Sequence, residues 1–329
     1  MSATDHAPDA HPRRTLLGER LDLRRFVRLA GGLLAVVALA FLIRELIRQA
    51  PALSTWRPSA WTFTLLCALA IAHGSALFLL AEAWHRIVGI FAPEPRRRTW
   101  PSYTVTQVAR YLPGNVAHLL GRAVWLRGTL DTATLTRATL VELAVVPLGG
   151  VLALAPLALV VDVAALEPAL QVVGLKGLPP VWLSVGALSA CATGLLVVAT
   201  LLLGGPRSVG RLAAPTLLTA LFMAWLGGSF AVVVHVSGLD LSSGEWPLMV
   251  AAAILAWLVG YATPGAPGGL GVREAVLVML AGGLTIAGEA TAAVLLAAII
   301  HRLVTTCGDA VCFAAGWAMH RRKRAISDT

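Results

Sequence analysis

The sequence predicts an all-α protein, a polytopic membrane helix bundle of about eight transmembrane helices with one or two re-entrant or broken segments. The mean hydropathy is +0.78, hydrophobic residues make up 57% of the chain and charged residues only 13%. Apolar runs close to the roughly 20 residues needed to cross a hydrocarbon core of about 30 Å recur along the chain. Glycine and proline interrupt two Arg-bearing segments, residues 110–122 and 261–274. These three observations place the chain in a membrane.

Eight apolar windows are predicted to be transmembrane helices. They cover residues 29–46, 61–84, 138–161, 181–203, 212–236, 247–259, 272–286 and 291–319. We expect a disordered cytoplasmic tail over residues 1–25, a transmembrane domain over 26–320 and a basic cytoplasmic tail over 321–329. The first helix is predicted to be uncleaved, because charged residues rather than a small-residue cleavage site follow it.

The charges of the connecting loops predict the orientation of the bundle. The net charge is +9, and its basic residues gather at the ends of apolar runs, as the positive-inside rule requires. One side carries Arg96, Arg97, Arg98, Arg127, Arg137, Arg207, Arg211 and the basic residues 321–324; the other carries Asp162, Glu167, Asp240, Glu245 and Glu289. We therefore expect a multi-pass protein of the bacterial inner (cytoplasmic) membrane with both termini cytoplasmic, and no binding to nucleic acid.

The first broken segment is predicted to be a re-entrant hairpin over residues 102–125, since the alternation of loops holds only if this stretch enters and leaves on one face. Its polar residues are Thr104, Gln107, Arg110, Asn115, His118 and Arg122. Such a stretch is tolerated at membrane depth only where protein or water satisfies its polar groups. The alternative is an amphipathic helix that lies along the cytoplasmic surface.

Within this segment, Arg110 and Arg122 flank the turn at Pro113, Gly114 and Asn115. A helix is expected to restart at Asn115, which would serve as its N-cap. Arginine suits phosphate, because its planar guanidinium makes bidentate hydrogen bonds. We expect Arg110, Asn115 and Arg122 to bind substrate. A purely topogenic role for Arg122 is the alternative.

The second broken segment follows the predicted helix 247–259, which at 13 residues is too short to cross the membrane without help. The predicted hinge residues of this segment are Pro264, Gly265, Gly268, Gly269 and Gly271. Those of the first segment are Pro113 and Gly114. Paired interruptions of this kind point to a transporter site made of discontinuous helices. Arg273 in the first turn of the next helix opposes the helix dipole, which favours a bound anion. Alternatively, Glu274 pairs with Arg273 or another arginine and seals the turn.

The final helix carries His301, Arg302 and Asp309 within an apolar run, and intramembrane ions are candidates for functional sites. Arg302 and Asp309 are seven residues apart, about 10 Å along the helix axis, so each is expected to need another partner. Glu142 is the predicted partner of Arg302 or Arg273, and Glu142 and Asp309 are expected to balance the arginine charges. The sequence leaves two roles open for these ionisable residues, a structural ion pair between helices and a proton relay. His73 is predicted to be an interior histidine with satisfied hydrogen bonds.

No catalytic signature such as a nucleophile elbow, a zincin motif or a P-loop is present. The four cysteines lie in apolar runs without the spacing of metal ligands. We therefore expect no catalytic residue, no metal and no cofactor, although whether the chain is an enzyme stays uncertain.

Three signatures resemble the flippase-like family that includes the membrane domain of lysylphosphatidylglycerol synthases. They are residues 111–115 (Tyr-Leu-Pro-Gly-Asn) with Gly121, Arg122 and Glu142; residues 264–274 (Pro-Gly-Ala-Pro-Gly-Gly-Leu-Gly-Val-Arg-Glu); and Arg302-Leu303. The resemblance runs over about residues 29–319 and implies a bundle that moves lipids or lipid-linked headgroups between leaflets. The chain ends soon after residues 321–324, so the soluble aminoacyl-transferase domain of those synthases is not expected.

The sequence thus favours a lipid transporter in which Arg110, Arg122, Arg273 and Arg302 line a cavity for an anionic headgroup. Asn115 and Glu274 complete the predicted set of substrate-binding residues. The expected partner is an anionic phospholipid or a polyprenyl-phosphate-linked lipid. One alternative is a membrane enzyme acting on a polyprenyl-phosphate-linked sugar, with Glu142, Glu274 or Asp309 as general base. Another is a non-transporting scaffold for cell-envelope enzymes.

Overall fold

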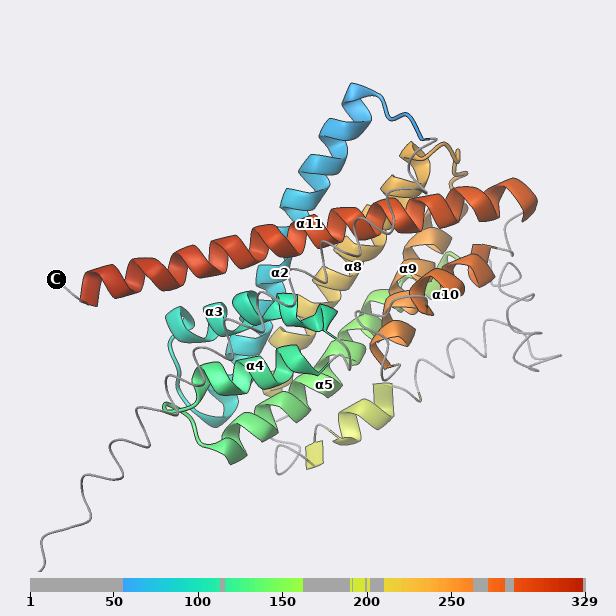
Figure 1. Cartoon of the computed structure of the whole chain (residues 1–329). Coiled ribbons are helices and arrows are strands. Elements are labelled where there is room, and N and C mark those ends of the chain that lie inside the picture. The colour runs from blue at the N-terminus through green and yellow to red at the C-terminus, as the bar shows by residue number, and fades with distance from the viewer. Residues whose placement is uncertain are drawn as a thin grey trace, which may run out of the picture.

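The chain folds as a bundle of helices (Figure 1). The computed structural model describes residues 56–112, 116–161, 190, 192–198, 200–201, 210–262, 272–281 and 287–327, and this part contains helices and no strand. It confirms the predicted all-α class.

Five helices within the described ranges are long and apolar enough to cross a membrane. They are α2 (Ala60–Phe91), α5 (Thr132–Leu154, extended by the short η3 at Leu157–Leu159), α8 (Ala213–Val236), α9 (Glu245–Ala262) and α11 (Ala287–Ser327). They match five of the eight predicted windows. Window 29–46 lies outside the described residues, window 181–203 is described only in part, and window 272–286 is described as α10 (Val272–Ala281). A total of about eight spans stays a prediction.

The length predicted for the sixth window is wrong. Helix α9 has 18 residues rather than 13, which gives it a length of about 27 Å, enough to cross most of a bilayer core. The helix begins with a polar turn, which a search for apolar residues overlooks. In this turn the Glu245 carboxylate accepts hydrogen bonds from the Ser242 backbone N–H at 2.8 Å and from the Ser242 hydroxyl at 2.7 Å. The bond from the Glu245 carboxylate back to the Ser242 backbone N–H is one half of a capping box.

Helix α5 also begins earlier than predicted, at Thr132 rather than residue 138. Asp131 caps it by accepting hydrogen bonds from the Thr134 backbone N–H at 2.7 Å and from the Thr134 hydroxyl at 3.0 Å. These bonds favour the carboxylate and lower the pKa of Asp131 below its usual value. At the other end of the chain, α11 runs for 41 residues, so the predicted basic tail is helical as far as Ser327.

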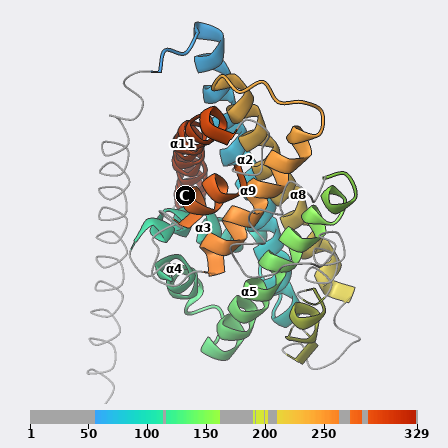
Figure 2. The same cartoon turned by 90° about the vertical axis from the view of Figure 1, so that its right-hand side faces the viewer.

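Helices α2 and α11 cross at very short range, and α11 also contacts α8 and α10. At the crossing, a Cβ added to Gly74 would lie 2.7 Å from the Gly308 carbonyl oxygen, and one added to Gly308 would lie 2.8 Å from the Ala70 oxygen. Small residues permit this approach in membrane bundles. Figure 2 looks nearly along α11 and shows α2 and α8, which both contact it.

The first broken segment forms a pair of short helices that pack on the bundle. It comprises α3 (Arg96–Thr106), the 3-10 helix η2 (Gln107–Tyr111) and α4 (Ala117–Leu126). Helix α3 contacts α2, α4 and α11, and α4 contacts α5 (Figure 1). Val116 caps α4 without a side-chain hydrogen bond, so the predicted N-cap at Asn115 is wrong. Residues 113–115, which join η2 to α4 in the sequence, lie outside the described residues.

Candidate functional site: two adjoining polar pockets

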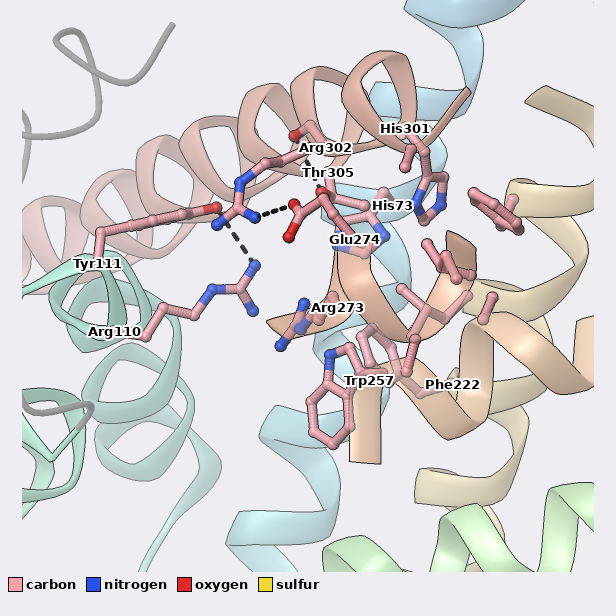
Figure 3. A pocket seen from close by; sticks show the side chains of 16 residues that line it. His73, Arg110, Tyr111, Phe222, Trp257, Arg273, Glu274, His301, Arg302 and Thr305 are labelled. Carbon is pink, nitrogen blue, oxygen red and sulfur yellow. Dashed lines mark hydrogen bonds and ion pairs between the residues drawn. The ribbon is translucent and has the colours of Figure 1, made fainter. Parts of the chain in front are cut away.

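A pocket with an empty volume of about 680 Å³, part of it open to solvent, lies among α2, η2, α8, α9, α10 and α11. Its charged lining residues are Arg110, Arg273, Glu274 and Arg302, and its other polar and aromatic ones are His73, Tyr111, Phe222, Phe230, Trp257, His301 and Thr305. We call it the Arg273 pocket (Figure 3).

Two ion pairs occupy one side of the Arg273 pocket. Arg302 Nη1 lies 2.6 Å from Glu274 Oε1, and Arg110 Nη2 lies 2.5 Å from Asp309 Oδ2. The prediction that Arg302 and Asp309 each need a partner other than one another is therefore confirmed. Glu274 does pair with an arginine, but that arginine comes from α11 rather than from the same turn.

Tyr111 joins the Arg110–Asp309 pair and ties η2 to α11. Its hydroxyl donates to Asp309 Oδ2 and lies 3.1 Å from the Thr306 hydroxyl, and Arg110 lies over its ring with the guanidinium carbon 5.2 Å from the centroid. No contact of Tyr111 was predicted from the sequence. Its place beside Pro113 in the first signature was the signal that could have identified it.

Arg273 differs from its two neighbours. Across the described part of the chain it has neither an ion pair nor a side-chain hydrogen bond, and its Nε is buried without a partner. Its guanidinium lies over the Trp257 ring, 5.3 Å from the centroid. With Asp309 and Glu274 paired to Arg110 and Arg302, one positive charge in this cluster is unmatched.

A second pocket, which we call the Arg122 pocket, lies next to the first. Its polar lining residues are Tyr103, Gln107, Arg110, His118, Arg122, Glu142, Tyr261 and Arg273. Arg122 Nη1 donates to both carboxylate oxygens of Glu142, and Nη2 donates to Gln107 Oε1 at 3.3 Å. The guanidinium also stacks over Tyr103, 3.9 Å from the ring centroid.

This geometry corrects two expectations. Glu142 was predicted to pair with Arg302 or Arg273, but it pairs with Arg122, because α4 and α5 pack together and place both side chains in the interior. A purely topogenic Arg122 would remain in water, whereas this side chain is 2% exposed. Arg122 therefore holds the hairpin on the bundle and does not line the Arg273 pocket.

The two pockets share a wall made of Arg110, Trp257 and Arg273. Trp257 supports this wall, because its ring stacks on Tyr261 with centroids 5.2 Å apart while Arg273 lies over it. No motif in the sequence distinguishes Trp257 from the other tryptophans among the ten in the chain. The structure makes it the aromatic partner of the unmatched arginine.

The remaining predicted site residues are not tested by the structure. Asn115 and the hinge residues Pro113, Gly114, Pro264, Gly265, Gly268, Gly269 and Gly271 lie outside the described residues. His73 is interior, as predicted, but the expectation of satisfied hydrogen bonds is wrong: neither ring nitrogen has a partner in the described ranges.

Comparison of the chain with protein-family models, curated proteins and solved structures gave no match. The flippase-like resemblance therefore stays a prediction from three motifs. Any conclusion on function must come from the pockets themselves.

Proposed function

We propose that this chain is an integral membrane transporter that binds an anionic lipid headgroup in the Arg273 pocket and carries it between leaflets. The observation that supports the proposal is the unmatched charge of Arg273 in a pocket that Arg110 and Arg302 also line. An unpaired cation at membrane depth costs at least several kcal/mol, so such residues persist where a ligand or partner neutralises them. A phosphate group has the required charge and matches the arginine fork.

The position of Arg273 in α10 supports the same ligand. Helix α10 begins at Val272, so Arg273 lies in the first turn, where the helix dipole and the free backbone N–H groups are positive. A cation there is unfavourable by itself. An anion at this point would be stabilised by both the guanidinium and the helix terminus.

The hairpin next to the pocket favours an embedded rather than a surface position. On α4 and its N-cap, Val116, Leu120 and Val124 are exposed, whereas His118 and Arg122 are buried. A surface amphipathic helix turns its polar face to water. Here the polar face turns into the protein and the apolar face turns outward, which suits lipid contact. We infer that the hairpin re-enters the membrane and that η2 carries Arg110 to headgroup-binding depth.

The enzymatic alternative receives less support from this geometry. Glu142, Glu274 and Asp309 each accept a hydrogen bond from an arginine, so each of these carboxylates already has a charged partner and none stands apart as a general base. No specific observation favours a scaffold over a transporter.

A transport assay tests the proposal. Purified protein is reconstituted into liposomes that contain acyl-labelled fluorescent phosphatidylglycerol, and dithionite quenching reports how fast the label reaches the outer leaflet. We expect wild-type protein to accelerate exchange, and Arg273→Ala and Arg302→Ala to remove most of that acceleration.

The matched control is Arg86→Ala, which also removes one arginine from an ion pair, but from a half-exposed side chain far from the pocket lining. It should transport at the wild-type rate. Exchange that is unaffected by both Arg273→Ala and Arg302→Ala would overturn the assignment.

A further inference from the structure

We propose that the Arg273 pocket contains a second subsite at His73, which binds the uncharged, hydroxyl-bearing part of a lipid headgroup whose phosphodiester lies at Arg273. The ligand class is thus a monoanionic phosphodiester lipid with a neutral hydroxylated headgroup. This inference rests on the proposed function and specifies its substrate.

His73 is held firmly in the pocket wall. It precedes Gly74 at the crossing of α2 and α11, where a Cβ added to Gly308 would lie 2.9 Å from His73 Cδ2. Its ring also packs on Phe222, with centroids 5.7 Å apart. The side chain is 2% exposed and lines the same pocket as Arg273 (Figure 3). These contacts leave the ring little room to turn toward another partner.

Both ring nitrogens of His73 are buried without a hydrogen-bond partner in the described part of the chain. A neutral imidazole has one donor and one acceptor nitrogen, and leaving both unpaired in the interior costs free energy. The complementary ligand group must therefore accept one hydrogen bond and donate another. Hydroxyl groups do both, whereas ionised phosphate oxygens only accept and ammonium groups only donate.

The neighbouring histidine shows that this situation is specific to His73. His301 Nε2 lies 2.9 Å from the Ser229 hydroxyl, and its ring meets the edge of Phe230 with centroids 5.4 Å apart. Two residues of α8 thus hold the His301 side chain in place. Of the two histidines in this pocket, His73 is the one that offers both nitrogens to a ligand.

The charge around the subsite argues against a cationic headgroup. The described pocket lining contains three arginines and one carboxylate, Glu274, which pairs with Arg302. A ligand ammonium group would meet like charges at short range, which disfavours binding. A glycerol or sugar headgroup adds hydroxyls without adding charge.

Lipid binding to the purified full chain in detergent tests the inference. The probes are phosphatidylglycerol, phosphatidylethanol and phosphatidylethanolamine with identical acyl chains. The first two are monoanionic phosphodiesters that differ in their hydroxyls, so they isolate the His73 subsite. We expect phosphatidylglycerol to bind roughly tenfold more tightly than phosphatidylethanol, a difference of about 1.4 kcal/mol. Phosphatidylethanolamine should bind most weakly.

Two variants separate the two halves of the site. His73→Phe, which keeps a planar ring, should lower phosphatidylglycerol affinity to that of phosphatidylethanol and leave phosphatidylethanol unchanged. Arg273→Gln should weaken both anionic lipids. His235→Phe, which changes a histidine exposed on α8, is the control and should alter neither.

Equal wild-type affinities for phosphatidylglycerol and phosphatidylethanol would overturn the inference, because a water molecule rather than a ligand hydroxyl would then occupy the subsite. That result would leave the proposed function intact. Failure of all three lipids to bind would overturn the proposed function and the subsite with it.

A polyprenyl-phosphate sugar, added as a competitor, has the same headgroup chemistry on a different lipid tail. Displacement of phosphatidylglycerol by this glycolipid, but not by an ethyl phosphodiester of the same polyprenol, would support the subsite. Equal displacement by both would count against it.

Discussion

Arg122 and Arg273 lie in adjoining pockets that share a wall, yet their charges are matched to different degrees. Arg122 donates to both oxygens of Glu142 and also to Gln107, so its charge is balanced within the fold. The Arg273 pocket has three arginines, and within the described ranges Arg110 and Arg302 are paired whereas Arg273 is not. Matched charge indicates a structural role, and unmatched charge indicates a place for a ligand. The difference predicts that mutation of the Arg122–Glu142 pair lowers the stability of the fold, whereas mutation of Arg273 lowers lipid affinity.

The largest effect on stability is expected in the Arg122 pocket. Glu142→Gln removes one negative charge and leaves Arg122 buried without compensation, which should lower the stability of the fold by about 3–5 kcal/mol. The drop in the thermal unfolding midpoint of the detergent-solubilised protein, followed by tryptophan fluorescence, measures it.

The double variant Arg122→Met/Glu142→Met is the matched control for that loss. It removes both charges and fills a similar volume with apolar atoms, so most of the stability should return. If Glu142→Gln melts at the wild-type temperature, the Arg122–Glu142 pair does not have the structural role assigned to it.

In the Arg273 pocket, Arg273→Gln should change binding rather than stability. Loss of a charge-assisted hydrogen bond, worth about 1.5–3 kcal/mol, should weaken anionic-lipid binding roughly 10- to 150-fold. The unfolding midpoint measured without lipid should stay the same or rise, because an unmatched buried charge is removed. A lower midpoint with unchanged lipid affinity would make Arg273 a structural residue and remove the contrast between the pockets.

The smallest effect is expected where the hairpin meets α11. Tyr111→Phe removes the hydroxyl that donates to Asp309 and contacts Thr306, at a cost of about 0.5–1.5 kcal/mol. The thermal midpoint should fall slightly, and lipid affinity should change with it because Arg110 shares the same carboxylate. Thr134→Val, which disturbs only the exposed cap of α5, serves as the control for lipid affinity.

Hydropathy was enough to predict the middle of each described spanning helix, but it could not predict their ends. Helix α9 extends to Glu245 and helix α5 to Thr132 because polar capping residues begin them. Caps depend on hydrogen bonds from a few polar atoms, and an apolar window excludes those residues by construction.

The types of residue in the site were predictable, whereas their pairing was not. Intramembrane arginines are rare enough to select Arg110, Arg122, Arg273 and Arg302 from the sequence. Glu142 lies nearer in sequence to Arg122 than to Arg273, but only the packing of α4 on α5 decides the pair. His73 looked like an ordinary core histidine, because the sequence does not show which polar atoms lack partners.

The most direct test of the account is an experimental structure of the protein in nanodiscs that contain phosphatidylglycerol, determined by electron cryomicroscopy. The account predicts phosphate-sized density in contact with Arg273, between the side chains of Arg110 and Arg302, and no such density in nanodiscs of zwitterionic lipid alone. A structure in which a group from residues 263–271 of the same chain pairs with Arg273, with no lipid density in the pocket, would contradict it.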